Sequence, residues 1–115
     1  MPRAGSGQLA ERRALRHYRL RGYRILATNV WVAGYELDLI VRRGRRLVFC
    51  EVKSKSGPGF GAPEEMVDRE KQRRLVRAAE AWLARNPACR DLDVSFEVIA
   101  VQEGSLRRLA LGDPF

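Results

Sequence analysis

The sequence has few of the side chains that build the commonest catalytic and metal centres. His17 is the single histidine, which excludes a histidine-based metal site and a Ser-His-Asp triad. The two cysteines, Cys50 and Cys89, show neither Cys-x-x-Cys nor Cys/His ligand spacing and cannot form a disulfide framework. Cys50 lies inside an apolar run, which predicts a small buried hydrophobic residue. A functional centre in this chain therefore has to use other side chains.

Long apolar segments are also missing. No stretch approaches the ~20 apolar residues of a membrane span, and residues 1–7 lack the apolar core of a signal peptide. We therefore expect a soluble, cytoplasmic protein without a membrane partner. The length of 115 residues suits one domain, 1–115, in which residues 1–6 are expected to be flexible.

Positive charge is abundant. The chain carries 22 Lys plus Arg against 14 Asp plus Glu, a formal net charge of +8, and nineteen of the 22 are arginines. Arginine binds phosphate through two parallel hydrogen bonds and stays charged in partly buried grooves, so this balance favours a nucleic-acid partner. The alternative is that an Arg-, Ala- and Leu-rich composition reflects only a GC-rich genome.

The hydrophobic pattern predicts an α/β domain with the element order α-β-β-β-α-β-β, a single mixed sheet flanked by helices. A first helix runs from a capping Ser6 to about Arg21 and is ended by Gly22. A second helix begins somewhere between residues 63 and 68 and ends near Arg85, before Asn86 and Pro87. The predicted strands cover residues 23–32, 36–41, 47–53, 94–101 and 106–111. Residues 54–62 form a Gly/Pro-rich loop, interpreted as a mobile rim.

The second and third predicted strands contain charged residues where a buried strand should be apolar. Asp38 lies between two leucines, Glu51 lies between Cys50 and Val52, and Lys53 follows two residues later. Alternation predicts that Glu36, Asp38 and Ile40 share a face, as do Leu47, Phe49, Glu51 and Lys53.

The turn at residues 42–46 decides whether these two sets meet. If Arg42 pairs with Leu47, then Asp38 lies opposite Glu51 and Glu36 lies opposite Lys53. A two-residue loop at residues 43–44 keeps the face but shifts the pairs, whereas a three-residue loop puts the acids on opposite faces.

Two neighbouring buried carboxylates repel each other and need a positive partner. A hard divalent cation, Mg²⁺ or Mn²⁺, suits oxygen ligands from separate strands, can activate water and can neutralise a phosphodiester. Lys53 can stabilise developing negative charge or help to position the water. The alternative is a purely structural ion pair between Lys53 and Asp38 or Glu51.

Two helices carry further candidates. Glu11 lies on the apolar face of the first helix, where an uncharged residue would be less costly, although it can simply pair with a neighbouring arginine. The second helix presents Gln72 beside a basic cluster, which is either a nucleic-acid contact or a solvated face. The candidate nucleic-acid contacts are Arg69, Gln72, Arg73, Arg74, Arg77 and Lys55.

The segment from Asp38 to Glu51-Val52-Lys53 resembles the PD-(D/E)xK nuclease motif. A wider set of residues looks like the YraN-like family of bacterial predicted endonucleases, over about residues 10–101. This set comprises residues 22–26, Asn29, residues 36–40, residues 47–53 and residues 71–75. In that family a glycine usually precedes the acid at position 36, whereas here Tyr35 stands after Gly34.

The resemblance implies a restriction-endonuclease-like fold, similar to that of Holliday-junction resolvases. It implies that Asp38 and Glu51 are metal ligands and Lys53 the catalytic lysine. Glu11 matches the family's helix acid, taken as a further metal ligand, and Glu36 matches the acid two residues before Asp38; both join the candidate catalytic set.

Three functions remain open from the sequence. The first is a metal-dependent endonuclease that hydrolyses DNA, in preference to RNA, with branched or damaged DNA as candidate substrates. The second is a non-catalytic nucleic-acid-binding module with the nuclease fold. The third is a small structural or ribosome-associated basic protein. A homodimer is also left open.

Overall fold

The computed structural model describes residues 6–55 and 63–112, excluding the side chains of Ser6, Pro63 and Glu64. Residues 1–5 of the predicted flexible tail, residues 56–62 of the Gly/Pro-rich loop predicted as a rim, and the predicted capping side chain of Ser6 lie outside what is described. Ser54, predicted to begin that loop, is instead the last residue of β3. The elements are α1 (Ser6–Leu20), β1 (Arg24–Val32), β2 (Tyr35–Arg43), β3 (Arg46–Ser54), α2 (Pro63–Met66), α3 (Arg69–Arg85), the 3₁₀ helix η1 (Pro87–Cys89), β4 (Asp93–Gln102) and β5 (Ser105–Ala110). No helix among these residues is long and apolar enough to cross a membrane.

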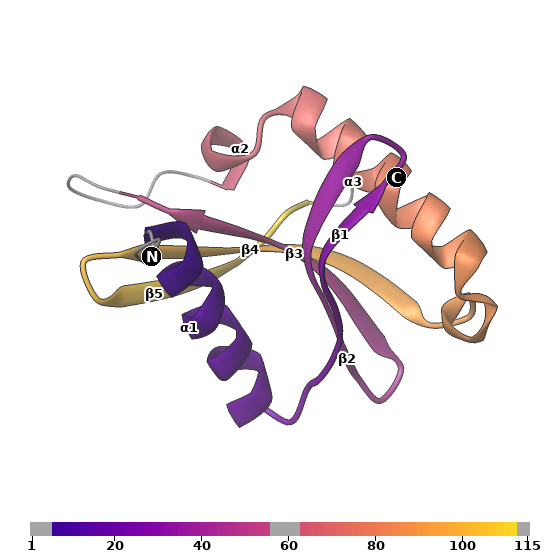
Figure 1. Ribbon diagram of the computed structural model, residues 1–115, viewed down its shortest axis with the longest axis horizontal. Coiled ribbons are helices and arrows are strands. Elements are labelled where there is room, and N and C mark those ends of the chain that lie inside the picture. The colour runs from indigo at the N-terminus through magenta and orange to yellow at the C-terminus, as the bar shows by residue number, and fades with distance from the viewer. Residues whose placement is uncertain (1–5, 56–62, 113–115) are drawn as a thin grey trace, which may run out of the picture.

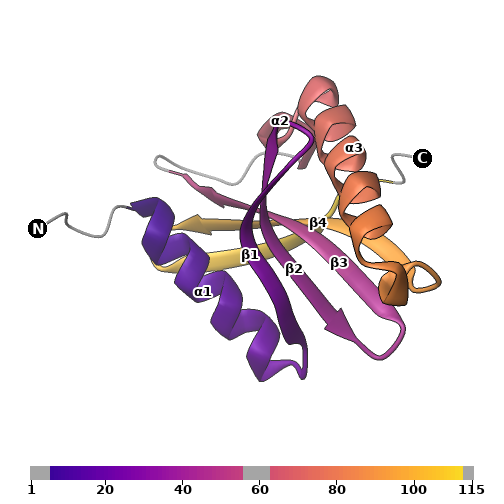
Figure 2. The same cartoon turned by 45° about the vertical axis from the view of Figure 1, so that its right-hand side comes forward.

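The strands form one five-stranded mixed sheet in the order β1-β2-β3-β4-β5. Strands β3 and β4 are parallel and are joined through the helical segment, while the other neighbouring pairs are antiparallel. Helix α1 covers one face of the sheet and α3 the other (Figures 1 and 2). The predicted fold class and element order, a mixed sheet flanked by helices, are confirmed.

Each face of the sheet has its own hydrophobic core. On the α3 side, Ile40 and Phe49 pack with Leu75 and Trp82 of the helix. On the α1 side, the sheet residues Leu39, Val41, Val48, Cys50 and Ile99 pack with Ala14 and Tyr18 of the helix. Burial of these side chains is what places α1 and α3 on opposite sides of the central strands. Cys50 is buried as predicted, and it is 2% exposed.

Local signals set where the helices begin and end. The backbone N–H groups of Gly22 and Tyr23 donate to carbonyls of the last turn of α1, with Gly22 in the left-handed region at φ 83°. The side chain of Asp68 accepts a hydrogen bond from the Lys71 N–H and caps α3. This cap divides the predicted second helix into a short α2 and the long α3.

A buried network ties α1 to the far edge of the sheet. Glu97 of β4 is 8% exposed and accepts hydrogen bonds from the Tyr18 hydroxyl (2.6 Å) and from Nε and Nη2 of Arg108 (2.8 and 3.0 Å). The Arg108 guanidinium also lies over the rings of Tyr18 and Tyr23. These contacts stabilise the packing of α1 against β4 and β5 and leave Glu97 outside the candidate site.

Candidate active site

The register between β2 and β3 brings Asp38 and Glu51 together. Arg42 pairs with Leu47, which is the pairing that one of the registers considered from the sequence assumed. Arg43 pairs with Arg46, so the turn itself consists of Gly44 and Arg45. The ladder runs to the pair formed by Leu39 and Cys50. Counting one step further in the same register places Asp38 opposite Glu51.

At this step the two strands separate, and a side chain replaces the backbone ladder. The Val52 N–H donates to Oδ2 of Asp38 at 2.9 Å. Strand β3 continues to pair with β4 on its other side, where Glu51 is aligned with Val98. The opening between β2 and β3 therefore leaves room for a carboxylate while Glu51 stays on a strand that is fixed by β4.

The environment of the pair shifts the pKa of Asp38. Burial, followed by the nearby negative charge of Glu51, raises the pKa of Asp38 to about 7, and the Val52 N–H and Lys53 oppose this effect. Glu51 is only 4% exposed, and its Oε1 accepts a hydrogen bond from the Tyr35 hydroxyl. Burial and this hydrogen bond raise the pKa of Tyr35 above its ordinary value, so Tyr35 remains a donor. Asp38 therefore stays largely protonated below neutral pH.

Glu11 and Glu36 are gathered next to this pair by Asn29. With its amide oriented to satisfy its neighbours, the Asn29 nitrogen donates to Oε1 of Glu11 (3.0 Å) and to Oε1 of Glu36 (3.1 Å). Burial raises the pKa of Glu11, the Asn29 hydrogen bond lowers it, and Asp38 and Glu36 raise it further. Asn29 has a φ of 52°, in the left-handed region that asparagine tolerates better than most residues.

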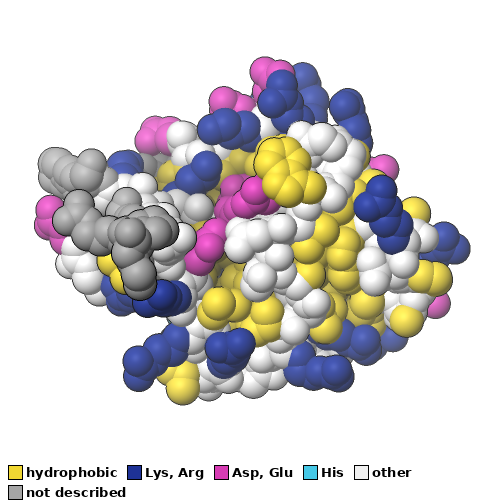
Figure 3. Space-filling view, in the orientation of Figure 1, with side chains coloured by type: hydrophobic (Ala, Val, Ile, Leu, Met, Phe, Trp, Pro, Cys, Tyr) yellow, Lys and Arg dark blue, Asp and Glu magenta, His cyan; other side chains and the backbone are white. Residues whose placement is uncertain are grey.

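A small pocket lies between α1 and this part of the sheet. Its volume is about 70 Å³, and its lining includes Glu11, Asn29, Asp38 and Val52. Figure 3 shows acidic side chains near the centre of this face of the molecule, beside a large exposed hydrophobic side chain and within reach of basic ones. The acids therefore face an accessible space instead of a closed core.

One expectation about strand faces is wrong. Alternation predicted that Glu36, Asp38 and Ile40 project together, but Ile40 packs on the α3 side, whereas Glu36 shares Asn29 with Glu11 of α1. Leu37 and Leu39, two residues apart, also belong to the cores on opposite faces. The regular pleat is interrupted at Asp38, because its side chain occupies the position of a ladder partner.

The donor set fits a divalent cation held by two carboxylates. Mg²⁺ commonly binds through one or two carboxylates and keeps several waters. Asp38 and Glu51 supply two adjacent carboxylates, and burial and the Glu51 charge, which raise the pKa of Asp38, are both effects that a bound cation would offset. Within residues 6–55 and 63–112, no three His, Cys, Asp or Glu side chains are arranged to hold a metal together. The structure therefore does not join Glu11 to Asp38 and Glu51 as a third ligand.

The basic candidates fall into two groups. Lys53 is half-buried on β3, aligned with Ala100 of β4, and its positive charge lowers the pKa of Asp38. Lys55 follows the strand, its N–H donates to the Val101 carbonyl, and its side chain lines a separate groove beside α1. Lys53 alone of the two therefore reaches the acid pair electrostatically.

The α3 candidates are mostly exposed. The four arginines at positions 69, 73, 74 and 77 are all exposed on this helix. Arg74 forms an ion pair with Glu70 at 2.9 Å, and its positive charge slightly offsets the rise that burial and Glu51 cause in the pKa of Tyr35. Gln72 instead donates to the Val67 carbonyl at 2.8 Å, so its amide supports the start of α3.

Sequence reasoning did not assign two of the residues that organise the site. Asn29 is a polar residue in a segment of β-branched and aromatic residues, a signal comparable to that of Asp38 in its strand. Tyr35 was noted only as a departure from the expected glycine, yet its hydroxyl holds Glu51. A tyrosine at the start of a strand gives no signal of its own, because this is an ordinary place for that residue.

Comparison with known proteins places the chain in a family. Residues 10–101 match the uncharacterised protein family UPF0102. A UPF0102 protein of Symbiobacterium thermophilum is 42% identical over 107 residues, covering 90% of this chain and 86% of the relative. A second, from Halorhodospira halophila, is 46% identical over 88 residues, covering 76% of this chain and 73% of the relative. The chain therefore belongs to the UPF0102 family, the YraN-like group that its motifs indicated.

Proposed function

We propose that the protein is a metal-dependent nuclease that hydrolyses phosphodiester bonds in DNA. The observation that supports this proposal best is the pair formed by Asp38 and Glu51 in the opening between β2 and β3. A buried acid pair that raises the pKa of one member costs stability, and such sites are typical of functional centres. A structural ion pair with Lys53 is the less favoured alternative, because within the described residues Lys53 makes no salt bridge within 4.0 Å.

Each residue of the site has a role in this proposal. Asp38 and Glu51 hold Mg²⁺ or Mn²⁺, which supplies an activated water and neutralises charge on the phosphate. The Val52 N–H fixes the orientation of Asp38, and the Tyr35 hydroxyl fixes that of Glu51. The ammonium group of Lys53 stabilises negative charge as it develops on the phosphodiester. Glu11 and Glu36, held by Asn29, extend the acidic surface next to the pair.

A cleavage assay tests the proposal directly. Labelled branched, duplex and single-stranded DNA is incubated with the protein in Mg²⁺, in Mn²⁺ and in EDTA. Cleavage is expected with either cation and not in EDTA, and Asp38→Asn, Glu51→Gln and Lys53→Met should each abolish it. The matched control is Asp93→Asn at the start of β4, since Asp93 pairs with Arg45 and has 78% of its side chain exposed.

The runner-up function is a nucleic-acid-binding module that retains the nuclease fold. It predicts binding without cleavage on all three substrates, and it predicts no effect of divalent cations on stability. Binding of a cation to the folded state alone stabilises the protein, so a melting temperature that rises with Mn²⁺ but not in Asp38→Asn favours the enzyme.

A further inference from the structure

The β1–β2 hairpin presents a large aromatic side chain to solvent. Trp31 is 67% exposed, whereas the second tryptophan, Trp82, is 7% exposed and packs edge to face on Phe49 in the core. Scattered exposed apolar residues are normal on protein surfaces, so exposure alone carries no conclusion. The position of Trp31 relative to the acids is what makes it informative.

Trp31 lies on the same side of the sheet as Glu36 and Glu11. It is aligned with Glu36 on β2, the carboxylate that shares Asn29 with Glu11. Its neighbours on β1, Val30 and Val32, pack into the core on the opposite, α3 side. The indole therefore lies beside the acids and not behind them.

Trp31 lies close to the tight turn of the β1–β2 hairpin. Ala33 and Gly34 make the turn, with φ values of 50° and 74°. Two successive left-handed residues are the signature of a two-residue hairpin turn whose twist matches the flanking strands. Val32 pairs directly with Tyr35 across this turn, and Tyr35 in turn holds Glu51. The geometry of one hairpin thus links Trp31 to the acid pair.

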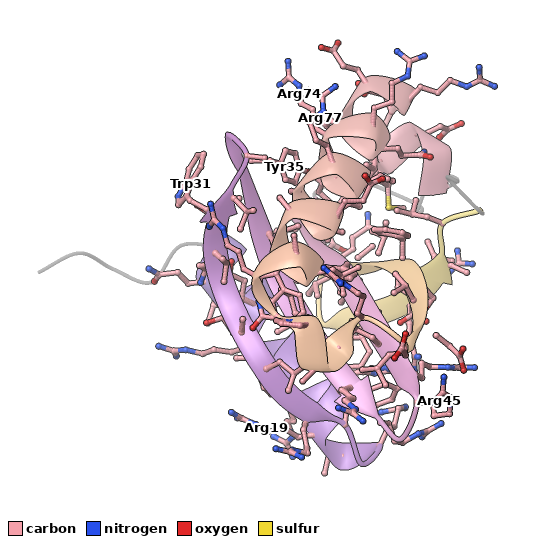
Figure 4. All side chains as sticks on the ribbon, turned by 90° about the vertical axis from the view of Figure 1, so that its right-hand side faces the viewer. Arg19, Trp31, Tyr35, Arg45, Arg74 and Arg77 are labelled. Atoms are coloured by element: carbon pink, nitrogen blue, oxygen red, sulfur yellow. The ribbon has the colours of Figure 1, made fainter. Side chains whose placement is uncertain are left out.

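Positive charge borders the same end of the molecule. Figure 4 shows Trp31, Tyr35, Arg74 and Arg77 together at one end, with the Tyr35 side chain between Trp31 and α3. The residue aligned with Trp31 across the sheet, by contrast, is the carboxylate Glu36, which shares Asn29 with Glu11. A phosphate backbone is repelled there, whereas a base is uncharged and can cover the indole without that cost.

We propose that Trp31 stacks on an unpaired base of a nucleic acid whose backbone passes the Asp38–Glu51 pair. The inference rests on the proposed function and narrows its substrate to nucleic acids with unpaired nucleotides at the cleavage position. In a continuous duplex both faces of every base are covered by neighbouring pairs, so the indole has nothing to stack on. Proteins that bind single strands gain much of their affinity from the stacking of bases on aromatic side chains.

Fluorescence in EDTA tests stacking separately from cleavage. The protein is titrated with a single-stranded oligonucleotide and with its fully paired duplex, and tryptophan emission is followed. We expect quenching by the single strand that is absent in Trp31→Ala, and weaker binding of the single strand by roughly 5- to 100-fold. Trp31→Phe should retain part of the affinity, because a smaller aromatic ring still stacks. Duplex affinity should stay within about twofold in both variants.

The matched control is Leu20→Ala at the end of α1, since Leu20 is another large exposed apolar residue, 71% exposed. It should leave single-strand binding unchanged. Unchanged single-strand affinity in Trp31→Ala overturns the inference. If sedimentation shows that this variant also changes self-association, Trp31 belongs to a contact between protein chains. If DNA is cleaved but Trp31→Ala is neutral, the proposed function stands without the stacking. If single strands are bound through Trp31 but never cleaved, the nuclease proposal fails alone.

Discussion

The hydroxyl of Tyr35 on β2 donates a hydrogen bond to Oε1 of Glu51 on β3. It does so at the point where these two strands have already separated, one step beyond their last aligned pair, Leu39 and Cys50. Glu51 is therefore held from β2 by a side chain and not by the backbone ladder. The orientation of this carboxylate depends on a residue that carries no charge and lies outside the acidic motif.

Replacing Tyr35 with Phe should weaken binding of divalent cations. The ring keeps its packing, but Glu51 loses the donor that fixes its carboxylate, and a hydrogen bond to a charged group is worth about 1.5–3 kcal/mol. We expect the Mn²⁺ dissociation constant to rise by about tenfold or more and cleavage to fall with it. Calorimetric titration of the purified variant with Mn²⁺ measures the first effect, and initial cleavage rates measure the second.

Tyr18→Phe is the matched control for this change. Tyr18 also donates its hydroxyl hydrogen to a buried glutamate, Glu97, but in the network that ties α1 to the far edge of the sheet. The Tyr18→Phe variant should have a lower free energy of unfolding and an unchanged affinity for Mn²⁺. Equal loss of cation affinity in both variants would show that Tyr35 acts only through general stability.

The stability of the metal-free protein should fall as the pH rises from about 4 to about 7. The pKa of Asp38 is raised from 3.8 to about 7 in the folded protein, so between these values the folded state binds more protons than the unfolded state. Stability is then greatest below the ordinary pKa and is lost as the pH rises through the folded value. Each tenfold change in the ionisation constant corresponds to about 1.4 kcal/mol.

Asp38→Asn removes this titration and should flatten the profile. Its unfolding free energy in EDTA should equal or exceed that of the wild type near pH 7, because the repulsion with Glu51 is gone. A smaller slope remains from Glu11, whose pKa is also raised by burial. Urea unfolding in EDTA at several pH values gives both curves, and parallel curves would refute the raised pKa of Asp38.

The network around Glu97 should matter for folding and not for activity. Arg108→Met removes both hydrogen bonds to this carboxylate and leaves a largely buried charge without its counter-ion. We expect a loss of roughly 2–4 kcal/mol, somewhat below the cost for fully buried pairs, because Arg108 is partly exposed. The double variant Glu97→Gln/Arg108→Met should recover part of this loss in urea unfolding. A double variant as unstable as Arg108→Met would mean that the guanidinium acts by packing on Tyr18 and Tyr23.

The element order and the alignment of Arg42 with Leu47 were predictable because they follow from short-range rules. Periodicity located the strands, and the Gly44 turn left few registers, one of which places Asp38 opposite Glu51. Helix α3 ends at Arg85, directly before Asn86 and Pro87, as the helix-breaking proline predicts. Each of these signals acts between residues that are close in the chain.

The parts that were not predictable depend on long-range contacts. Strands β2 and β3 separate where the Asp38 carboxylate accepts a hydrogen bond from the Val52 N–H. The hydrophobic pattern of neither strand predicts that a side chain takes the place of a backbone acceptor there. The grouping of Glu11 with Glu36 depends on Asn29, whose left-handed backbone interrupts β1. Strict alternation assigns side chains to the wrong side of the sheet wherever a side chain replaces the backbone as hydrogen-bond acceptor.

The arginines of α3 should contribute to nucleic-acid binding through phosphate contacts. The charge of Arg74 partly offsets the rise in the pKa of Tyr35, and Arg74, Arg77 and Tyr35 lie at the same end of the molecule (Figure 4). Replacing both with Ala should weaken binding without regard to base sequence. If each contacts one phosphate, the slope of log affinity against log salt should flatten by about 1.8 for duplex DNA, or by about 1.4 for a single strand.

Arg19 and Arg45 provide the matched control, since they lie at the opposite end of the molecule in Figure 4. Replacing both with Ala removes the same charge, so any effect of net charge alone is equal in the two double variants. Binding is measured in EDTA at four or more salt concentrations, which keeps cleavage out of the comparison. A flatter slope in the Arg74/Arg77 variant only would place phosphates along α3 beside the acid pair. Equal slopes in the two variants would show that the α3 arginines form a solvated face, and the path of the nucleic acid past Tyr35 would have to be abandoned.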